Sequence, residues 1–300
     1  MKKILIAILV LAAAVSCNKE NDFKQEEVTA SFTFEFPEVA QTKAYSDGKT
    51  AKELHYAVYD GRTGNFLFGT TSPVAIDITT SVNIGLVKGH PYDIVFWAQA
   101  EGVDYYKFDK SAKTITVNNY TTDANDEKRD AFYQKVENYY YTSTPTTVKL
   151  YRPFAQINFL AKDYRSAQSM IGRTMKSKIK IKGIPNVLNV MTGEATGSID
   201  ADFKSTSVPA VLGEKMDGYH SYGYISMNYV LAHKEKDNFT KNLLGVFYMN
   251  GNPITLTVPN VPYQRNFRTN IIGSFFTGTG SFTVQIVPTY DPSGDHIVNH

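Results

Sequence analysis

The single cysteine of this sequence, Cys17, lies in a context that suits covalent lipid attachment. Lys2 and Lys3 precede an unbroken apolar run from Ile4 to Val15, which ends in Ala-Val-Ser-Cys. The run is shorter than the roughly 20 apolar residues needed to cross a bilayer, so we interpret it as a processing segment. We predict a lipoprotein signal peptide over residues 1–16 and acylation of Cys17. The alternative is a plain secretory signal followed by a chance cysteine.

The other reactive side chains do not have the spacing of a catalytic or metal site. His296 and His300 are four residues apart, but they lie in a polar tail with no helical pattern to align them. Motifs for a nucleophile elbow, a phosphate-binding loop and a dinucleotide site are absent from the sequence. Asp123, Asp126, Glu127 and Asp130 form a cluster with Lys128 and Arg129 among them, which favours a solvated surface. We expect no enzyme activity, no catalytic residue, no metal and no cofactor.

The net charge and the cysteine content indicate which partners and which covalent crosslinks the mature chain can have. The formal net charge is +2, and removal of residues 1–16 takes away Lys2 and Lys3 and brings it to zero. There is then no overall basic field of the kind that nucleic-acid-binding proteins use. With one cysteine, the mature chain has no disulfide and depends on its core for stability. We expect no nucleic-acid partner.

Short β-segments separated by turns dominate the rest of the chain. In residues 28–36, Ala30, Phe32, Phe34 and Phe36 alternate with polar residues, which predicts a half-buried strand. Residues 92–100 are apolar on both faces, as in a central strand that is covered on both sides. The Asp60-Gly61 and Asn250-Gly251 pairs predict hairpins. Further strands are expected at 66–71, 114–120, 146–151, 178–190, 222–230, 243–249, 254–258, 270–276 and 281–290.

These elements predict a mostly β fold of two antiparallel β-sandwich domains in tandem with minor short helices. Helical turns are expected within 123–138 and 161–173, and a linker near 143–147. The expected parts are a signal peptide at 1–16, a lipidated tether at 17–27, an N-terminal domain at 28–148 and a C-terminal domain with a polar tail at 149–300.

Two tyrosine-rich stretches, 137–144 and 218–230, keep a second function open. Exposed tyrosine rings can stack on sugars, although tyrosine is also common in ordinary strands. The corresponding hypothesis is a monomeric glycan-binding lipoprotein at the cell surface.

The order of these segments resembles the fimbrillin family, the type V pilins and pilin-like lipoproteins of Bacteroides-type bacteria. The resemblance rests on the signal peptide, Cys17, the polar tether, the alternating first strand, and a basic residue before an acidic Gly turn. The stretches RPFAQINF (152–159) and YQRNFRTNIIG (263–273) are also similar to family segments. This family has two transthyretin-like β-sandwich domains.

The resemblance implies a subunit or anchor of a fimbria, held by lipid on Cys17 at the outer membrane and exposed at the cell surface. It implies cleavage after the first strand, here at Lys43-Ala44, where the family usually has arginine. Loss of the strand with Phe32, Phe34 and Phe36 then opens a groove that a strand of the next subunit fills. The C-terminal Phe282, Val284 and Ile286 repeat the first strand's pattern and are the candidate donor residues. The expected partners are other pilin-like subunits, the membrane, and a host or glycan ligand for adhesion.

Overall fold

The computed structural model describes residues 26–36, 48–76, 81–163, 176–205, 212–215, 221–234, 238–249, 252–276, 282–287 and 296–298. These residues form strands almost throughout, and the one helix among them is the short 3-10 turn η1 (Glu127–Arg129). The predicted mostly β fold with antiparallel sheets is therefore confirmed. The number of tandem domains and their transthyretin-like connectivity stay predictions.

Two sheets of the N-terminal half pack face to face. Three strands form one sheet in the order β11 (Thr146–Lys149), β1 (Glu27–Glu35) and β5 (Ser81–Val87). The facing sheet has the order β10 (Phe132–Tyr139), β6 (Tyr92–Ala100), β2 (Ala51–Asp60) and β3 (Phe66–Gly69), with β4 (Val74–Ala75) beside β2. Alternate side chains from both sheets form one hydrophobic cluster, because successive residues of a strand point to opposite faces.

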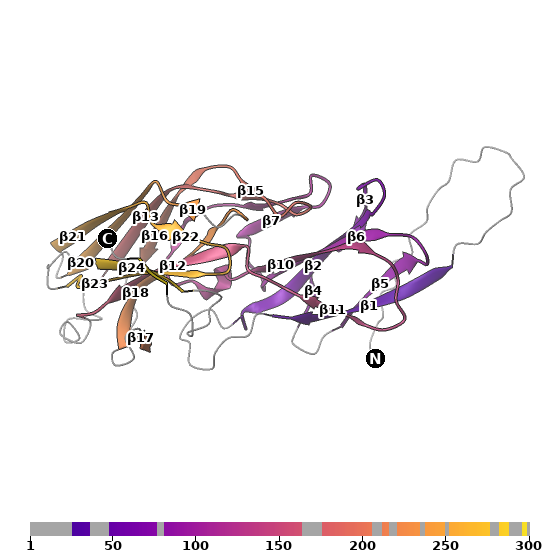
Figure 1. The fold of residues 1–300 in the computed structure, drawn as a ribbon, viewed down its shortest axis with the longest axis horizontal. Helices are drawn as coiled ribbons and strands as arrows, with labels where there is room; N and C mark the ends of the chain where they lie inside the picture. The colour runs from indigo at the N-terminus through magenta and orange to yellow at the C-terminus, as the bar shows by residue number, and fades with distance from the viewer. Residues whose placement is uncertain are drawn as a thin grey trace, which may run out of the picture.

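The sheets of the C-terminal half form the other end of an elongated molecule (Figure 1). The first has the order β17 (Leu212–Lys215), β18 (Ser221–Leu231), β12 (Phe154–Ala161), β23 (Arg268–Gly273), β24 (Phe282–Val287) and β25 (His296–Val298). The second has the order β21 (Asn252–Pro259), β20 (Asn242–Met249), β13 (Lys176–Ile184), β16 (Ile199–Ser205) and β9 (Thr121–Asp123). β19 (Asn238–Phe239) pairs with β22 (Pro262–Tyr263).

A small sheet links the two halves of the sequence. Its order is β15 (Ala195–Thr196), β14 (Val187–Asn189), β8 (Thr114–Val117) and β7 (Tyr106–Asp109). Strands β8 and β9 precede residue 148 in sequence, yet they pair with β14 and β16 from the second half. The strand pairing of the first half therefore extends beyond the segment 28–148 that the sequence suggested.

Strand β6 has the two buried faces that its sequence predicted. Ile94, Phe96 and Ala98 join the cluster between the two N-terminal sheets. Val95 and Trp97 join the second cluster, in which Trp97 packs against Tyr106 with a centroid distance of 5.1 Å. One strand therefore contributes to both hydrophobic cores.

The strands of both predicted hairpins pair, β2 with β3 and β20 with β21, and Asn250-Gly251 lies outside the described residues. The helical turn expected within 123–138 is limited to η1, and the second part of the segment, from Phe132, is strand β10. The charged residues Lys135 and Glu137 on one face of β10 concealed its alternation in the sequence. The helix expected at 161–173 lies largely outside the described residues.

Candidate functional site

Strand β1 is an interior strand of its sheet. It pairs antiparallel with β5 from Glu27↔Val87 to Thr33↔Ser81, and parallel with β11 from Phe32↔Thr146 to Glu35↔Lys149. β5 and β11 have no pairing with each other, so β1 alone joins them into a sheet. Without β1, each neighbour would present an unpaired backbone edge.

The inward face of β1 is buried as the alternating sequence predicted. Ala30 and Phe32 are fully buried and Phe34 is 7% exposed. The ring of Phe96 on β6 lies 5.2 Å from Phe32 and 5.1 Å from Phe34, centroid to centroid. Phe32 also contacts Tyr139 at 5.1 Å. The three residues are therefore part of the core between the two sheets.

Phe36 continues this face beyond the end of the strand. Its ring meets that of Phe132 edge-on at 5.0 Å and is partly buried. The guanidinium of Arg152 lies 4.6 Å from the centre of the same Phe132 ring. The end of the first strand thus packs beside the buried arginine that begins the RPFAQINF stretch.

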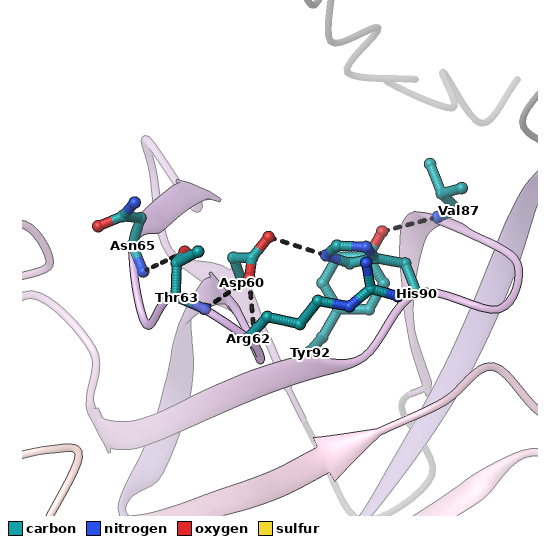
Figure 2. A network of polar contacts seen from close by, with 7 residues as sticks. All are labelled: Asp60, Arg62, Thr63, Asn65, Val87, His90 and Tyr92. Carbon is teal, nitrogen blue, oxygen red and sulfur yellow. Dashed lines mark hydrogen bonds and ion pairs between the residues drawn. The ribbon is translucent and has the colours of Figure 1, made fainter. Parts of the chain in front are cut away.

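The start of β1 is held by the turn between β5 and β6. The backbone N–H of Lys88 donates to the carbonyl of Glu26 at 2.9 Å, and the two side chains form an exposed ion pair at 2.9 Å. The N–H of Val87 donates to the hydroxyl of Tyr92 at 2.9 Å (Figure 2). These contacts fix both the turn and the entry of the first strand.

Asp60 connects that turn to the neighbouring hairpin (Figure 2). Its carboxylate accepts hydrogen bonds from the N–H groups of Arg62 and Thr63, both at 2.8 Å, and lies 2.9 Å from Nε2 of His90. The backbone hydrogen bond from Thr63 is the main cause that lowers the pKa of Asp60. The His90 ring lies against Tyr92 in a tilted arrangement, with the ring centroids 4.8 Å apart. Asp60 therefore supports the turn that holds β1.

The candidate donor residues are built into a sheet of the same chain. β24 pairs with β23 over Gly273↔Phe282 to Arg268↔Val287 and with β25 over Val284↔Val298 to Ile286↔His296. Val284 is buried, whereas Phe282 is partly buried. β24 is thus an interior strand, and its release would also separate β23 from β25.

Other predicted site residues lie beyond the described ranges. Cys17, Lys43, Ala44 and His300 are outside them. In the part of the chain that the structure describes, no group of three His, Cys, Asp or Glu residues could hold a metal ion. No helix there is long and apolar enough to cross a membrane.

The tyrosine stretches do not form an exposed platform in the described residues. Among the tyrosines whose side chains the structure describes in these stretches, Tyr139, Tyr224 and Tyr229 are buried, Tyr141 is half-buried and Tyr140 is 48% exposed. Tyr229 points its hydroxyl toward Glu127 rather than to the surface. These rings stabilise the core more than they offer sugar contacts.

Sequence reasoning missed one buried ion pair beside this site. Asp130 was expected on a solvated surface, but it is fully buried and bonded to Arg152. The sequence does contain a sign that Arg152 is buried, because it directly precedes Pro153 and an apolar strand. Its partner Asp130, however, is 22 residues away in the chain.

Comparison with known proteins identifies the family of this chain. A family model described as a family of unknown function, DUF6562, matches residues 21–297. The chain belongs to this family. No curated protein matches the sequence.

Solved structures show that the fold of this DUF6562 member is similar to that of surface-related proteins from Bacteroides and Parabacteroides, including a fimbrial assembly protein. A candidate polysaccharide-binding protein from Bacteroides thetaiotaomicron superposes with a TM-score of 0.51 at 15% identity, over 90% of this chain and 98% of that one. A fimbrial assembly protein from Parabacteroides distasonis has a TM-score of 0.50 at 12% identity, over 92% and 100%. The tip fimbrial protein Mfa3 from Porphyromonas gingivalis, with a C-terminal truncation, gives 0.47 at 11%, over 87% and 99%. The predicted resemblance to fimbrillins is confirmed as a likeness of fold.

Proposed function

We propose that this protein is a structural subunit or anchor of a fimbria-related surface polymer with a role in adhesion, and not an enzyme. The supporting observation is the position of β1, which alone joins β5 and β11 and buries Ala30, Phe32 and Phe34. Assembly by strand exchange needs a strand of this kind, whose loss leaves both an apolar groove and two open edges.

The energetics make replacement of β1 favourable once it is gone. Each large apolar side chain returned to such a groove contributes about 1.5–3 kcal/mol. A new strand would also restore the backbone ladder to β5 and β11, which an exposed edge lacks. An incoming strand with the same alternation as Phe32, Phe34 and Phe36 fits both requirements.

The proposed donor is the C-terminal segment with Phe282, Val284 and Ile286. Its residue alternation matches that of the first strand, with an aromatic or aliphatic side chain at every second position. Since β24 pairs on both sides in this chain, donation requires that it first leaves β23. Exchange between copies would then be slow unless a partner or a released edge assists it.

We further propose that lipid on Cys17 holds the protein at the outer membrane, with its folded part at the cell surface. Cleavage at Lys43-Ala44 would free the part from Ala44 onward for assembly, while the first strand stays with the lipidated N-terminus and can leave its groove. A chain that is never cleaved would keep β1 and serve as an anchor. The intact mass of protein recovered from native outer membranes separates these states: acylated chain from Cys17, or unlipidated chain from Ala44.

Strand exchange is tested directly with a chain in which residues 40–44 form a site for a specific protease. The cut chain is mixed with a synthetic peptide of residues 281–290, and with a control peptide in which Phe282, Val284 and Ile286 are serine. We expect the first peptide to displace residues 26–36 and to remain bound during gel filtration. A cut chain that binds neither peptide and remains monomeric would contradict strand exchange.

The glycan-binding monomer is the second candidate. Its tyrosine stretches offer Tyr140 as an exposed ring, but Tyr139, Tyr224 and Tyr229 are in the core. Loss of glycan binding on Tyr140→Ala, in a chain that stays monomeric after cutting, would favour this candidate over assembly.

A further inference from the structure

A row of lysines crosses the outer face of the second C-terminal sheet. Lys176, Lys178, Lys180 and Lys182 occupy every second position of β13, and Ser177, Ile179 and Ile181 between them are buried. Alternate residues of a strand are about 6.8 Å apart, so the four ammonium groups extend over roughly 20 Å on one side of the sheet. We call these four residues the lysine row.

The lysine row is not a device for protecting a sheet edge. Lysines often lie on edge strands, where they prevent unwanted pairing. β13, however, is an interior strand that pairs with β16 over Ser177↔Ser205 to Ile184↔Ile199 and with β20 over Lys176↔Tyr248 to Ile181↔Leu243. Four like charges on one interior strand repel one another, so solubility alone does not explain this arrangement.

Few carboxylates neutralise the row. Asp202 on β16 is directly opposite Lys180 in the ladder, and its carboxylate lies 3.5 Å from Nζ of Lys178 and 3.9 Å from Nζ of Lys204. Asp200 is exposed on the same face of β16. Among the described residues, no carboxylate forms an ion pair with Lys176, Lys180 or Lys182, and all three are exposed. The surrounding half is basic, since residues 149–300 contain 16 lysines and arginines against 10 aspartates and glutamates.

An apolar row lies beside the lysine row on the same face. Tyr248, Val246 and Leu244 of β20 are directly opposite Lys176, Lys178 and Lys180, and all three are half-buried. Neighbouring strands are about 4.8 Å apart, so each lysine has an apolar neighbour within reach. Thr255 and Thr257 of β21 add exposed hydroxyls one strand further on.

From this surface we infer a binding site for an acidic polysaccharide, a linear sugar polymer with carboxylate or sulfate groups. The lysine row complements regularly spaced negative charges, the apolar row offers a surface for sugar rings, and the threonines offer hydrogen bonds. A flat, open sheet face suits an extended chain better than a small molecule, which needs a concave pocket. The inference goes beyond assembly, because the face is on a different sheet from β1.

The test measures binding of the mature chain, with Cys17→Ala, to immobilised polygalacturonate and heparin, with neutral dextran as the reference. We expect binding to both anionic polymers that weakens steeply with salt, since bound counterions are released. The variant K176Q/K180Q/K182Q should bind about tenfold more weakly, given the modest value of each exposed charge contact. The matched control K52Q/K107Q/K234Q removes three exposed lysines elsewhere and should stay within about twofold of the wild type.

A second variant tests the site because it should bind the acidic polysaccharides more tightly. Asp202→Asn releases Lys178 and Lys204 from their shared carboxylate, so binding should strengthen about two- to threefold. Equal loss in both triple variants, or no gain in D202N, would overturn the site. So would tighter binding to phosphatidylglycerol vesicles or to an acidic protein than to either polysaccharide. The peptide exchange of the cut chain should be unchanged in K176Q/K180Q/K182Q, which separates this inference from assembly.

Discussion

Arg152 and Asp130 form a fully buried, two-pronged ion pair at the point where the first strand ends. Nε of Arg152 lies 2.6 Å from Oδ1 of Asp130, and Nη2 lies 2.8 Å from Oδ2. Neither side chain is exposed, and the guanidinium stacks on Phe132, which also contacts Phe36. The pair therefore connects Asp130, directly after η1, to Arg152, two residues before β12, next to the site of the proposed exchange.

Breaking this pair on one side should be strongly destabilising. Asp130→Ala leaves the arginine charge buried without its carboxylate, and we expect a loss of about 3–5 kcal/mol in the free energy of unfolding. The double variant D130L/R152M removes both charges and should recover most of that loss, because apolar residues of similar size replace the pair. Urea unfolding of the three chains measures both effects. A double variant less stable than D130A would contradict the interpretation.

Phe32 should be the residue on which retention of β1 depends most. It is fully buried and contacts Phe96 and Tyr139, so Phe32→Ala should cost about 3–5 kcal/mol. Thr33→Ala on the opposite face loses a hydroxyl contact to Thr147 and should cost less than about 1 kcal/mol. In the protease-cut chain, F32A should also release residues 26–36 faster than T33A. Similar release rates, measured by mass spectrometry of the freed peptide, would count against a packing role.

Asp60 should make the wild-type protein sensitive to acid. Its pKa is lowered in the folded state, first by the backbone hydrogen bond from Thr63 and also by that from Arg62 and by His90. A carboxyl group with a lowered folded pKa stabilises the fold above its unfolded value near 3.8, and the contribution is lost as the pH falls below that value. Asp60→Asn should therefore be less stable at neutral pH and should lose less stability on acidification. Unfolding curves between pH 7 and 2.5 compare the two chains, and parallel profiles would exclude this role.

Two tyrosines, the partly buried Tyr105 and the buried Tyr263, should limit stability in alkali. Burial is the largest cause that raises the pKa of Tyr105 to about 12, and its hydrogen bond to Asp126 adds to the effect. Burial likewise raises the pKa of Tyr263 to about 12. Above pH 10 the unfolded chain loses these protons while the folded chain keeps them, so stability falls as the pH rises from 10 toward 12. Tyr105→Phe should lessen this fall, as followed by tyrosinate absorbance and unfolding midpoints; an unchanged fall would contradict the prediction.

The strands with a clear apolar pattern could be predicted from sequence. Burial of one face makes every second residue apolar, and burial of both faces makes nearly every residue apolar. β1 shows this with Ala30, Phe32 and Phe34, and β6 shows it with its doubly apolar run. Strand β10 was missed, since residues Tyr133 to Glu137 are only partly buried or exposed and include charges. Short-range patterns reveal burial on a face, but they do not reveal which distant strand provides the pairing partner.

The sequence by itself determined the mostly β character, the apolar face of the first strand, the hairpins and the candidate lipid attachment at Cys17, because each depends on neighbouring residues. Only the tertiary structure decided that β1 lies between β5 and β11, that β8 and β9 pair with strands of the second half, and that Asp130 is buried against Arg152. These relations join residues far apart in the chain. The β-propensity of neighbouring residues does not predict these relations, because hydrogen bonding between strands and the burial of charge depend on the whole packed core.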